Sequence, residues 1–285
     1  MNSAHLLNRV PDEVFLKLLW KARFGSELNL SSPKSFNEKM QWLKLYDRDP
    51  LHTELVDKVK VKKYVAEKIG EEHVIPTLGQ WLDSEAIDFD ALPERFVLKC
   101  NHTSGEGLIL CRDKTALNKE KTRSSLRKAL KDNYYLTYRE WPYRDVERCI
   151  LAEPYMEDKK AAALGLDTLP VYKFLCFEGT PRVIQTIQND KMPNETIDYF
   201  DTAWQLMDLR QNYPNSPVPA ERPPQLNEML QIAKTLSAGF HFVRIDLYLV
   251  NGQIYFSEYT FFSDAGFAPF YPESWNDRLG SWIEL

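Results

Sequence analysis

The pattern of apolar and polar positions predicts a helical beginning followed by a longer part that mixes strands and helices. Residues 11–24 place apolar side chains at helical spacing, with acids in the first turn, and Gly25 is expected to end this helix. Ser35 stands three residues before Glu38, which predicts a capping box at the start of a second helix. A third helix is expected over 52–70. The N-terminal quarter is therefore predicted to be mostly helical.

Short apolar runs bounded by glycine and proline follow, and they predict strands. The expected strands lie at 96–100, at 108–111, at 149–156 and on both sides of a turn at Glu178-Gly179. Further helices are expected at 115–138 and 225–238, with a helix-like segment at 157–166. This order of elements predicts an α+β fold.

The stretch 240–266 is expected to organise the C-terminal half of the chain. It contains two strand-like arms around Asn251-Gly252, which is a strong hairpin signal. In the first arm, aliphatic residues alternate with Arg244 and Asp246, and the second arm carries Glu258. We expect the aliphatic face to lie in the core and the Asp246 face to point toward a more polar region.

Whether the two acids of this hairpin share a face depends on the length of the loop. A two-residue turn would pair Val250 with Gln253 and place Asp246 and Glu258 on opposite faces, whereas a three-residue loop with Gly252 left-handed places them on one face. Two carboxylates on one face repel each other, and Mg²⁺ relieves that repulsion by accepting oxygen ligands. We therefore expect the odd loop and a metal between the two acids; an ordinary hairpin with solvated acids is the alternative.

The composition excludes several classes of function. The 285 residues carry a formal net charge of −5, which argues against binding to nucleic acid over a large surface. The apolar runs are too short for a membrane span, and the first residues lack the order of a signal peptide. The four cysteines show no CxxC spacing and do not cluster with the histidines, so neither a zinc site nor a disulfide framework is expected. Free thiols fit a cytoplasmic protein.

A lysine inside an apolar strand is the first candidate for chemistry. Lys99 must either reach the edge of the sheet or meet an anion. The loop after it exposes backbone N–H groups that can bind phosphate; its glycine and hydroxyl residues are Thr103, Ser104, Gly105 and Gly107. A hairpin whose lysine extends to solvent is the alternative. Lys173 also lies within an apolar strand.

Two other charged residues gain interest only from their surroundings. Lys58 follows Asp57 in a basic run that is most simply a solvated helix face, and it matters only if that helix packs beside the Lys99 strand. Glu153 ends an apolar strand just before Pro154. A carboxylate there can bind a ribose hydroxyl or an adenine edge, although a surface acid is the simpler interpretation.

Asp88 and Asp90 form a competing candidate. Their Asp-x-Asp spacing is the one that metal-dependent glycosyltransferases use to hold the diphosphate of a sugar nucleotide, although acids flanking a turn have the same spacing. The sequence contains no GxSxG, HExxH or Walker motif, so serine hydrolases, zinc proteases and P-loop enzymes have no support.

Taken together, the order of these pieces resembles the ATP-grasp superfamily and, within it, the TupA-like family of polysaccharide-biosynthesis proteins. The segments that carry the resemblance are LNLSSPKSFNEKMQWLKLYDRDP, LVDKVKVKKYV, LPERFVLKCNHTSG, YKFLCFEGTPRVI and VRIDLYLVNGQIYFSEYTFFSDAG, which span nearly the whole chain. The resemblance implies an ATP-grasp fold in which two sheet-bearing lobes sandwich ATP. We expect a helical N-terminal region at 1–75, a lobe with the phosphate loop at 76–152 and a lobe with the metal site at 153–285.

The resemblance also implies roles for single residues. Lys58 and Lys99 would bind the ATP phosphates beneath the loop that contains Thr103, Ser104, Gly105 and Gly107. Glu153 and Tyr155 would line the adenosine pocket. Asp246 and Glu258 would hold Mg²⁺ between the β- and γ-phosphates. Arg244 and Lys173 would steady the γ-phosphoryl group or the acyl phosphate.

The implied activity is a cytoplasmic ATP-dependent ligation. The enzyme would phosphorylate a carboxylate, and an amine would then displace the phosphate to form an amide. The carboxylate would belong to a uronic acid of a sugar nucleotide or surface polysaccharide, and the amine to an amino acid or small amine. The alternatives are a glycosyltransferase that uses Asp88 and Asp90, a kinase that stops at the phosphorylated carboxylate, and a non-catalytic glycan-binding protein.

The chain departs from the family pattern in three places. Thr260 stands where many ATP-grasp enzymes have an asparagine metal ligand, which puts a second metal ion in doubt. Val171 stands where an acid often precedes the Tyr-Lys pair. The helical beginning replaces the nucleotide-fold domain that usually precedes the ATP-grasp core, so the acceptor site is expected to be built differently.

Overall fold

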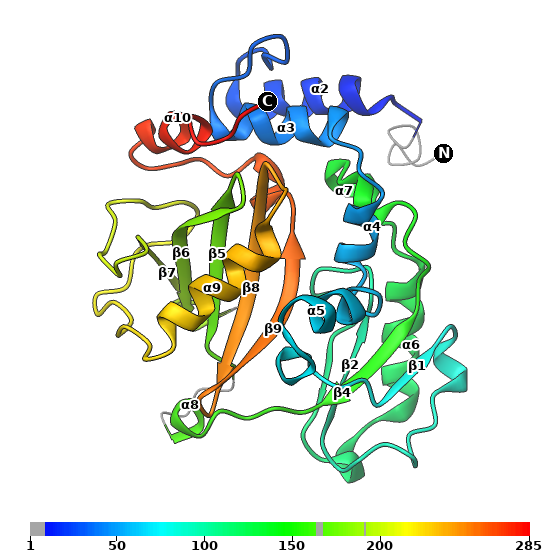
Figure 1. Ribbon diagram of the computed structural model, residues 1–285. Coiled ribbons are helices and arrows are strands. Elements are labelled where there is room, and N and C mark those ends of the chain that lie inside the picture. Colours follow the sequence, from blue (N-terminus) through cyan, green and yellow to red (C-terminus); the bar gives the residue numbers. More distant parts are fainter. Residues whose placement is uncertain (1–8, 164–167, 191) are drawn as a thin grey trace.

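Two antiparallel sheets form the framework of the protein, and they confirm the α+β class with two sheet-bearing lobes. A computed structural model describes residues 9–163, 168–190 and 192–285. The first sheet has the strand order β1 (Gly79–Trp81), β4 (Ile150–Pro154), β2 (Phe96–Cys100), β3 (Ile109–Cys111). The second has the order β7 (Thr196–Phe200), β6 (Thr180–Gln188), β5 (Val171–Phe177), β8 (Phe242–Val250), β9 (Gln253–Thr260). We call them the first and the second sheet (Figure 1).

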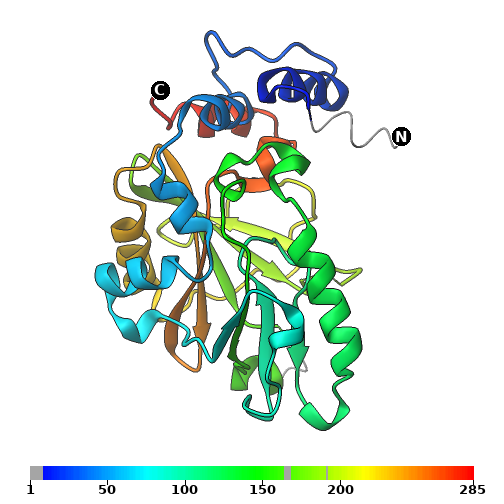
Figure 2. The same ribbon diagram turned by 90° about the vertical axis from the view of Figure 1, so that its right-hand side faces the viewer.

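Helices cover the outer faces of the sheets and one end of the molecule (Figures 1 and 2). The N-terminal helices are α2 (Asp12–Phe24), α3 (Phe36–Tyr46), α4 (Leu51–Val56) and α5 (Val61–Ile69). The later ones are α6 (Lys119–Lys131), α7 (Tyr135–Tyr138), α8 (Lys159–Ala163), α9 (Leu226–Ser237) and α10 (Ser274–Gly280). Within the described residues, no helix is long and apolar enough to cross a membrane.

Several local signals have the structure that was predicted for them. Ser35 and Glu38 form the capping box of α3, and Gly25 ends α2 in the left-handed conformation with φ 73°. The turn at Glu178-Gly179 joins β5 to β6, with φ 47° and 68° at the two residues. These features are local, because a cap or a tight turn depends on a few consecutive residues.

The prediction of one continuous helix over 52–70 is wrong, because this segment forms two helices, α4 and α5. The break lies at Asp57, whose backbone is extended with φ −74° and ψ 109°. Its Oδ1 accepts hydrogen bonds from the backbone N–H of Val59 at 2.9 Å and from Asn101 Nδ2 at 3.0 Å. The carboxylate therefore replaces a helical hydrogen bond and ties the start of α5 to the residue that follows β2.

Further elements differ from the prediction or extend beyond it. The helix expected at 115–138 is divided into α6 and α7, because Asp132 is extended with φ −67° and ψ 139°. Strand β7 and helix α10 lie in segments for which no element was predicted. The helix-like segment expected at 157–166 contains α8, and its last residues lie outside the described ones.

Each sheet has one apolar face that packs on a helix and one face that carries charged side chains. The first sheet packs on α6 through Phe96, Leu98, Cys100, Leu126 and Ala129. The second sheet packs on α9 through Phe174, Cys176, Ile184, Met229 and Ala233. By strand alternation, Lys99 and Glu153 lie on the other face of the first sheet, and Lys173 and Asp246 on the other face of the second.

Candidate functional site

The hairpin of β8 and β9 places both of its acids on one face, although its loop is not the predicted one. Val250 pairs with Gln253, so the turn is the two-residue one at Asn251-Gly252 and the predicted odd loop is wrong. Asn251 and Gly252 both have positive φ, 51° and 87°.

A β-bulge restores the shared face. Leu247 pairs with Phe256 but Asp246 pairs with Glu258, so Ser257 is an extra residue in β9. The sequence contains a signal for this bulge, because the large apolar residues of β9 change phase. Phe256 and Tyr259 are both buried, yet they lie three residues apart and would face opposite ways in a regular strand.

A charged row therefore crosses three neighbouring strands of the second sheet. Lys173 on β5 lies opposite Asp246 on β8, which lies opposite Glu258 on β9. Gln185 on β6 extends the row, because it pairs with Lys173; the sequence analysis did not single it out. The Lys173 Nζ to Asp246 Oδ2 distance is 3.5 Å.

Arg244 binds both acids of this row. It pairs with Asp246 in two parallel contacts, Nε to Oδ1 at 2.7 Å and Nη2 to Oδ2 at 2.8 Å, and Nη2 is 3.5 Å from Glu258 Oε1. Burial by itself would raise the pKa of the Glu258 carboxyl, but Lys58 and Arg244 outweigh it and hold that pKa below its usual value. Glu258 is therefore a carboxylate at neutral pH. Its side chain is 29% exposed, whereas that of Asp246 is 2% exposed.

Lys58 lies beside the strand of Lys99, which is the condition under which the sequence analysis gave it a role. Its backbone N–H donates to Asn101 O at 3.2 Å, and its Nζ donates to Thr103 O at 2.8 Å. The same Nζ is 3.8 Å from Glu258 Oε2, so this lysine links the loop after β2 with the second sheet.

Glu153 is bound by two lysines. Lys99 Nζ is 2.6 Å from Glu153 Oε2, and Lys62 Nζ is 2.7 Å from Oε1. Burial alone would lower the pKa of Lys99, but the Glu153 carboxylate outweighs it and raises that pKa, so Lys99 remains charged. Lys62 belongs to the basic run that follows Lys58 in the sequence, and no role was predicted for it. No periodic signal in the sequence marks Lys62, because its contact with Glu153 forms only through the tertiary fold.

The loop after β2 contains the predicted phosphate-binding residues in different settings. The Thr103 hydroxyl is buried and donates to Glu106 O at 2.7 Å, while Ser104 is exposed. Gly105 and Gly107 have φ 98° and 73°, and a Cβ on Gly107 would lie 2.6 Å from Ala129 Cβ. Gly107 is thus required both by its backbone and by its close approach to α6.

Tyr155, the other residue predicted to line the adenosine pocket, lies beyond β4 and accepts a hydrogen bond from Arg112 Nε at 3.1 Å.

A cavity of about 490 Å³ adjoins the charged row. At one end it is lined by Ser104 from the loop and by Lys173, Arg244, Glu258 and Thr260 from the second sheet. The other walls come from α2, from residues 134–143 and from residues 262–268. Their lining residues include Leu19, Arg23, Tyr134, Tyr138, Glu140, Tyr143, Phe262, Asp264 and Phe267. The N-terminal helix α2 therefore forms part of the cavity wall.

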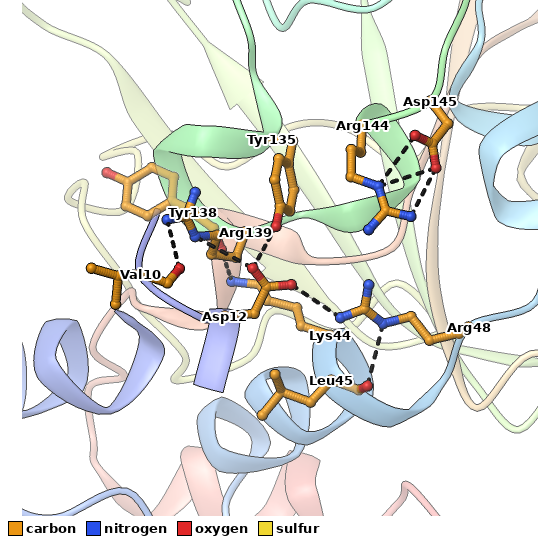
Figure 3. A network of polar contacts seen from close by, with 10 residues as sticks. All are labelled: Val10, Asp12, Lys44, Leu45, Arg48, Tyr135, Tyr138, Arg139, Arg144 and Asp145. Atoms are coloured by element: carbon orange, nitrogen blue, oxygen red, sulfur yellow. Dashed lines mark hydrogen bonds and ion pairs between the residues drawn. The ribbon is translucent and has the colours of Figure 1, made fainter. Parts of the chain in front are cut away.

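Asp12 fastens this helix to the rest of the wall (Figure 3). Its carboxylate accepts a hydrogen bond from the Tyr135 hydroxyl, lies 3.2 Å from Arg48 Nη2 and lies 3.5 Å from the Nε of buried Arg139. Lys44 Nζ donates to Tyr138 O at 3.0 Å and so binds the same segment from α3. One carboxylate thus connects α2 with α7 and with Arg48, which lies two residues beyond the end of α3.

Replacing Asp12 by alanine is expected to lower the free energy of unfolding by about 2 kcal/mol, because it removes a partly buried charge that three donors share. Neighbouring Glu13 is the matched control, since it forms an exposed ion pair with Lys17 at 2.6 Å. Glu13→Ala is expected to cost about 0.5 kcal/mol or less. Chemical denaturation measures both; equal effects would contradict a fastening role for Asp12.

The competing pair Asp88 and Asp90 lies apart from the cavity. Asp88 Oδ1 accepts hydrogen bonds from the backbone N–H groups of Asp90 at 3.0 Å and Ala91 at 3.2 Å, so it closes a local turn. The Asp90 side chain is 86% exposed and pairs with Lys119 at 2.9 Å. Neither residue lines the cavity, and the geometry gives no support to the glycosyltransferase alternative.

The carboxylate oxygens of Asp246 and Glu258 are of the kind that Mg²⁺ accepts. In the part of the chain that the structure describes, no group of three or more histidine, cysteine and acidic side chains is placed to bind a metal. Two carboxylates suit Mg²⁺ nevertheless, because this ion is typically held by one or two carboxylates together with phosphate oxygens and water. Glu258 is the more accessible of the two carboxylates, because both oxygens of Asp246 are bound by Arg244.

The comparison with protein families finds a match over most of the chain. Residues 38–284 match the family described as TupA-like ATPgrasp. No curated protein matches the chain in sequence.

Solved structures that resemble this one include three ligases. They are D-alanine–D-alanine ligase from Bacillus anthracis complexed with ATP (16% identity, TM-score 0.41, 73% of this chain and 53% of that chain), ATP-grasp ligase PsnB complexed with minimal precursor, Mg and ADP (10%, 0.40, 79% and 57%), and D-alanine–D-alanine ligase from Helicobacter pylori (13%, 0.44, 88% and 70%). This chain spans little more than half the length of the first two. Membership of the family rests on the match over 38–284.

Proposed function

Because this chain belongs to the TupA-like ATP-grasp family, we propose that it is an ATP-dependent ligase that joins a carboxylate to an amine through an acyl phosphate. The reaction needs cations around a triphosphate, a metal site at its β- and γ-phosphates, and an adjoining space for the acceptor. The proposal includes the division into a helical region at 1–75 and two lobes at 76–152 and 153–285.

The observation that carries the proposal is that Lys58, which is bound to the loop after β2, reaches the charged row of the second sheet. Lys58 is 3.8 Å from Glu258, which connects the loop after β2 with the row of Lys173, Asp246 and Glu258. Burying such alternating cations and acids costs free energy, because each charge loses its hydration. Clusters of this kind are therefore typical of functional sites. A bound triphosphate and its metal ion would complete it.

The hydrogen bonds of the lysines support distinct roles for them. Lys62 Nζ has three acceptors for its three N–H donors, namely Glu153, Ile75 O at 2.8 Å and Thr77 Oγ1 at 2.8 Å. Among the described residues, only Glu153 accepts from Lys99, so two of its three N–H groups can bind a further acceptor. We therefore assign phosphate binding to Lys99 and Lys58, and the support of Glu153 to Lys62. Glu153 and Tyr155 are proposed to border the adenosine.

Asp246 and Glu258 would hold Mg²⁺, which would neutralise the charge of the β- and γ-phosphates. Arg244 fixes the orientation of Asp246 through its two short contacts. Lys173 and Arg244 line the cavity at this end, where their positive charges would stabilise the phosphoryl group as it moves to the acceptor. Ser104 lines the same end from the loop that would cover the phosphates.

The acceptor is proposed to be a uronic acid of a sugar nucleotide or surface polysaccharide, and its partner an amino acid or small amine. This assignment follows the polysaccharide-biosynthesis character of the family. The cavity offers polar groups for such a substrate, among them Arg23, Glu140 and Asp264. We place the enzyme in the cytoplasm, where ATP and sugar nucleotides are made and where the four buried free cysteines stay reduced.

The test is incubation with Mg-ATP and a panel of uronic-acid nucleotides and amines, followed by mass spectrometry. We expect an amide whose formation requires both an amine and ATP and releases ADP and phosphate. Release of ADP without an amine, together with a phosphorylated carboxylate, would indicate a kinase instead. Absence of ADP with every carboxylate would contradict the ligase, and thermal stabilisation by UDP-sugars without ATP would favour a glycosyltransferase.

A further inference from the structure

Glu140 is a buried carboxylate in the cavity that the proposed roles do not use. The residue is 4% exposed and lines the cavity together with Arg244 and Glu258. Among the described residues, none donates a hydrogen bond to its carboxylate and none forms an ion pair with it. A buried acid normally has both, because burial removes the water that would solvate its charge. Its position therefore calls for a ligand that supplies the missing donor.

The backbone turn just before Glu140 places this residue in the wall of the cavity. Arg139, just before it, ends α7 in the left-handed conformation with φ 59°, which non-glycine residues rarely adopt. The guanidinium of Arg139 lies 4.3 Å from the ring of Phe15 and pairs with Asp12, so α2 holds this turn in place. The surrounding fold thus maintains a strained turn that presents an unpartnered acid to the cavity.

Charges of both signs act on Glu140. Burial raises the pKa of its carboxyl to about 7; Lys44 and Arg244 lower this pKa, and Asp264 and Glu258 raise it. Lys44 is occupied elsewhere, because its Nζ donates to Gln41 Oε1, Tyr138 O and Ala265 O at 3.1, 3.0 and 2.7 Å. A carboxyl with a pKa near neutrality exchanges a proton readily at physiological pH.

The other two carboxylates of the cavity are less suited to bind a new cation. Glu258 already contacts Lys58 and Arg244 and is the proposed metal ligand. Asp264 is exposed, so water competes with any cation for it. Glu140 alone among the three lining carboxylates is both buried and without a cation within ion-pair distance.

We propose that Glu140 binds the ammonium group of the amine co-substrate and acts as the base that deprotonates it. This inference rests on the proposed ligase function. An amine enters as an ammonium ion, which has no lone pair for attack, and a buried carboxylate beside the site of the acyl phosphate both attracts the ion and removes a proton.

The proton balance is as follows. The nitrogen transfers one proton to Glu140 and forms a bond to the acyl carbon, while the bond from that carbon to the phosphate oxygen breaks. The nitrogen also loses a second proton, with which the phosphate leaves as the hydrogen phosphate dianion. The products are the amide and hydrogen phosphate, and Glu140 returns its proton to solvent.

The experiment compares two nucleophiles in the wild type and in Glu140→Gln. The carboxylate substrate is the uronic-acid nucleotide that the panel identifies. The first nucleophile is the amine from the panel, which is an ammonium ion at neutral pH. The second is hydroxylamine, which is uncharged at neutral pH and traps an acyl phosphate as a hydroxamate without a base. We expect the variant to form amide about 100-fold more slowly at neutral pH and to form hydroxamate within about threefold of the wild type.

A rise in pH adds a second readout. It increases the fraction of free amine, so the deficit of Glu140→Gln in amide formation is expected to shrink as the pH approaches the pKa of the amine. Asp198→Asn is the matched control, because Asp198 is also buried, has a carboxyl pKa raised by burial and does not line the cavity. Its ratio of amide to hydroxamate is expected to equal that of the wild type even if its stability falls.

The possible outcomes separate this inference from the proposed function. Wild type that forms neither product from any uronic acid overturns the ligase function and this inference with it. Wild type that forms both products, with a variant that matches it for both, overturns only the role of Glu140. Loss of both products in Glu140→Gln to the same degree also overturns it, because that result indicates a structural residue.

Discussion

Glu258→Ala is expected to abolish turnover, with a loss of about 1,000-fold or more, and to abolish the Mg²⁺-dependent binding of ATP. The reason is that Glu258 is the accessible carboxylate of the charged row and stays ionised because Lys58 and Arg244 hold its pKa below the usual value. Without it, two cations face each other across the proposed metal site. Isothermal titration with ATP in the presence and absence of Mg²⁺ measures the binding.

The fold of this variant is expected to persist. The contacts of Glu258 with Lys58 and Arg244 are long, 3.8 and 3.5 Å, and its side chain is partly exposed, so its removal costs little stability. Glu228→Ala is the control, since Glu228 is an exposed acid on α9, on the other side of the same sheet. Unfolding of Glu258→Ala would identify a structural acid and would contradict the metal-binding role.

Lys99→Met is expected to lower kcat/KM for ATP by about 1,000-fold, chiefly through a higher KM, because two charge-assisted hydrogen bonds to the phosphates are lost. Lys62→Met is the matched comparison. Both lysines contact Glu153, but all three N–H groups of Lys62 donate to protein acceptors. We expect Lys62→Met to lower the melting temperature while ATP binding stays within about threefold. Equal loss of ATP affinity in both variants would show that Glu153, and not Lys99 itself, is the group that matters.

The hairpin of β8 and β9 shows which features a local sequence pattern predicts and which it does not. Asn251-Gly252 correctly predicts a hairpin, and its two-residue turn would by itself separate the acids. The bulge at Ser257 reverses that result. Its cause is long-range, because Phe256 and Tyr259 both pack in the core, where the Tyr259 hydroxyl donates to Leu236 O at 2.9 Å. The choice of two acids on one face was right, but the reason for it was not.

Residues that act through distant partners escaped the sequence analysis. Lys62 looked like one member of a solvated basic run until Glu153 was found within 2.7 Å of it. Glu140 follows a short helix and has no periodic signal of its own. It lines the cavity together with residues of α2 and of the segment after β9, which come from far along the chain. Contacts between segments so distant along the chain produce no periodic pattern within about ten or fifteen consecutive residues.

By itself, the sequence determined the class of most of the main elements, the capping box of α3, the turns at Glu178-Gly179 and Asn251-Gly252, and the types of residue at the charged row. These properties depend on neighbours within one turn of helix or one pair of strands, where spacing and propensity act directly. Only the tertiary structure decided which face Glu258 takes, which lysine keeps free donors and that α2 completes the cavity beside Glu140. Those outcomes depend on packing and desolvation between segments that approach each other only when the whole chain has folded.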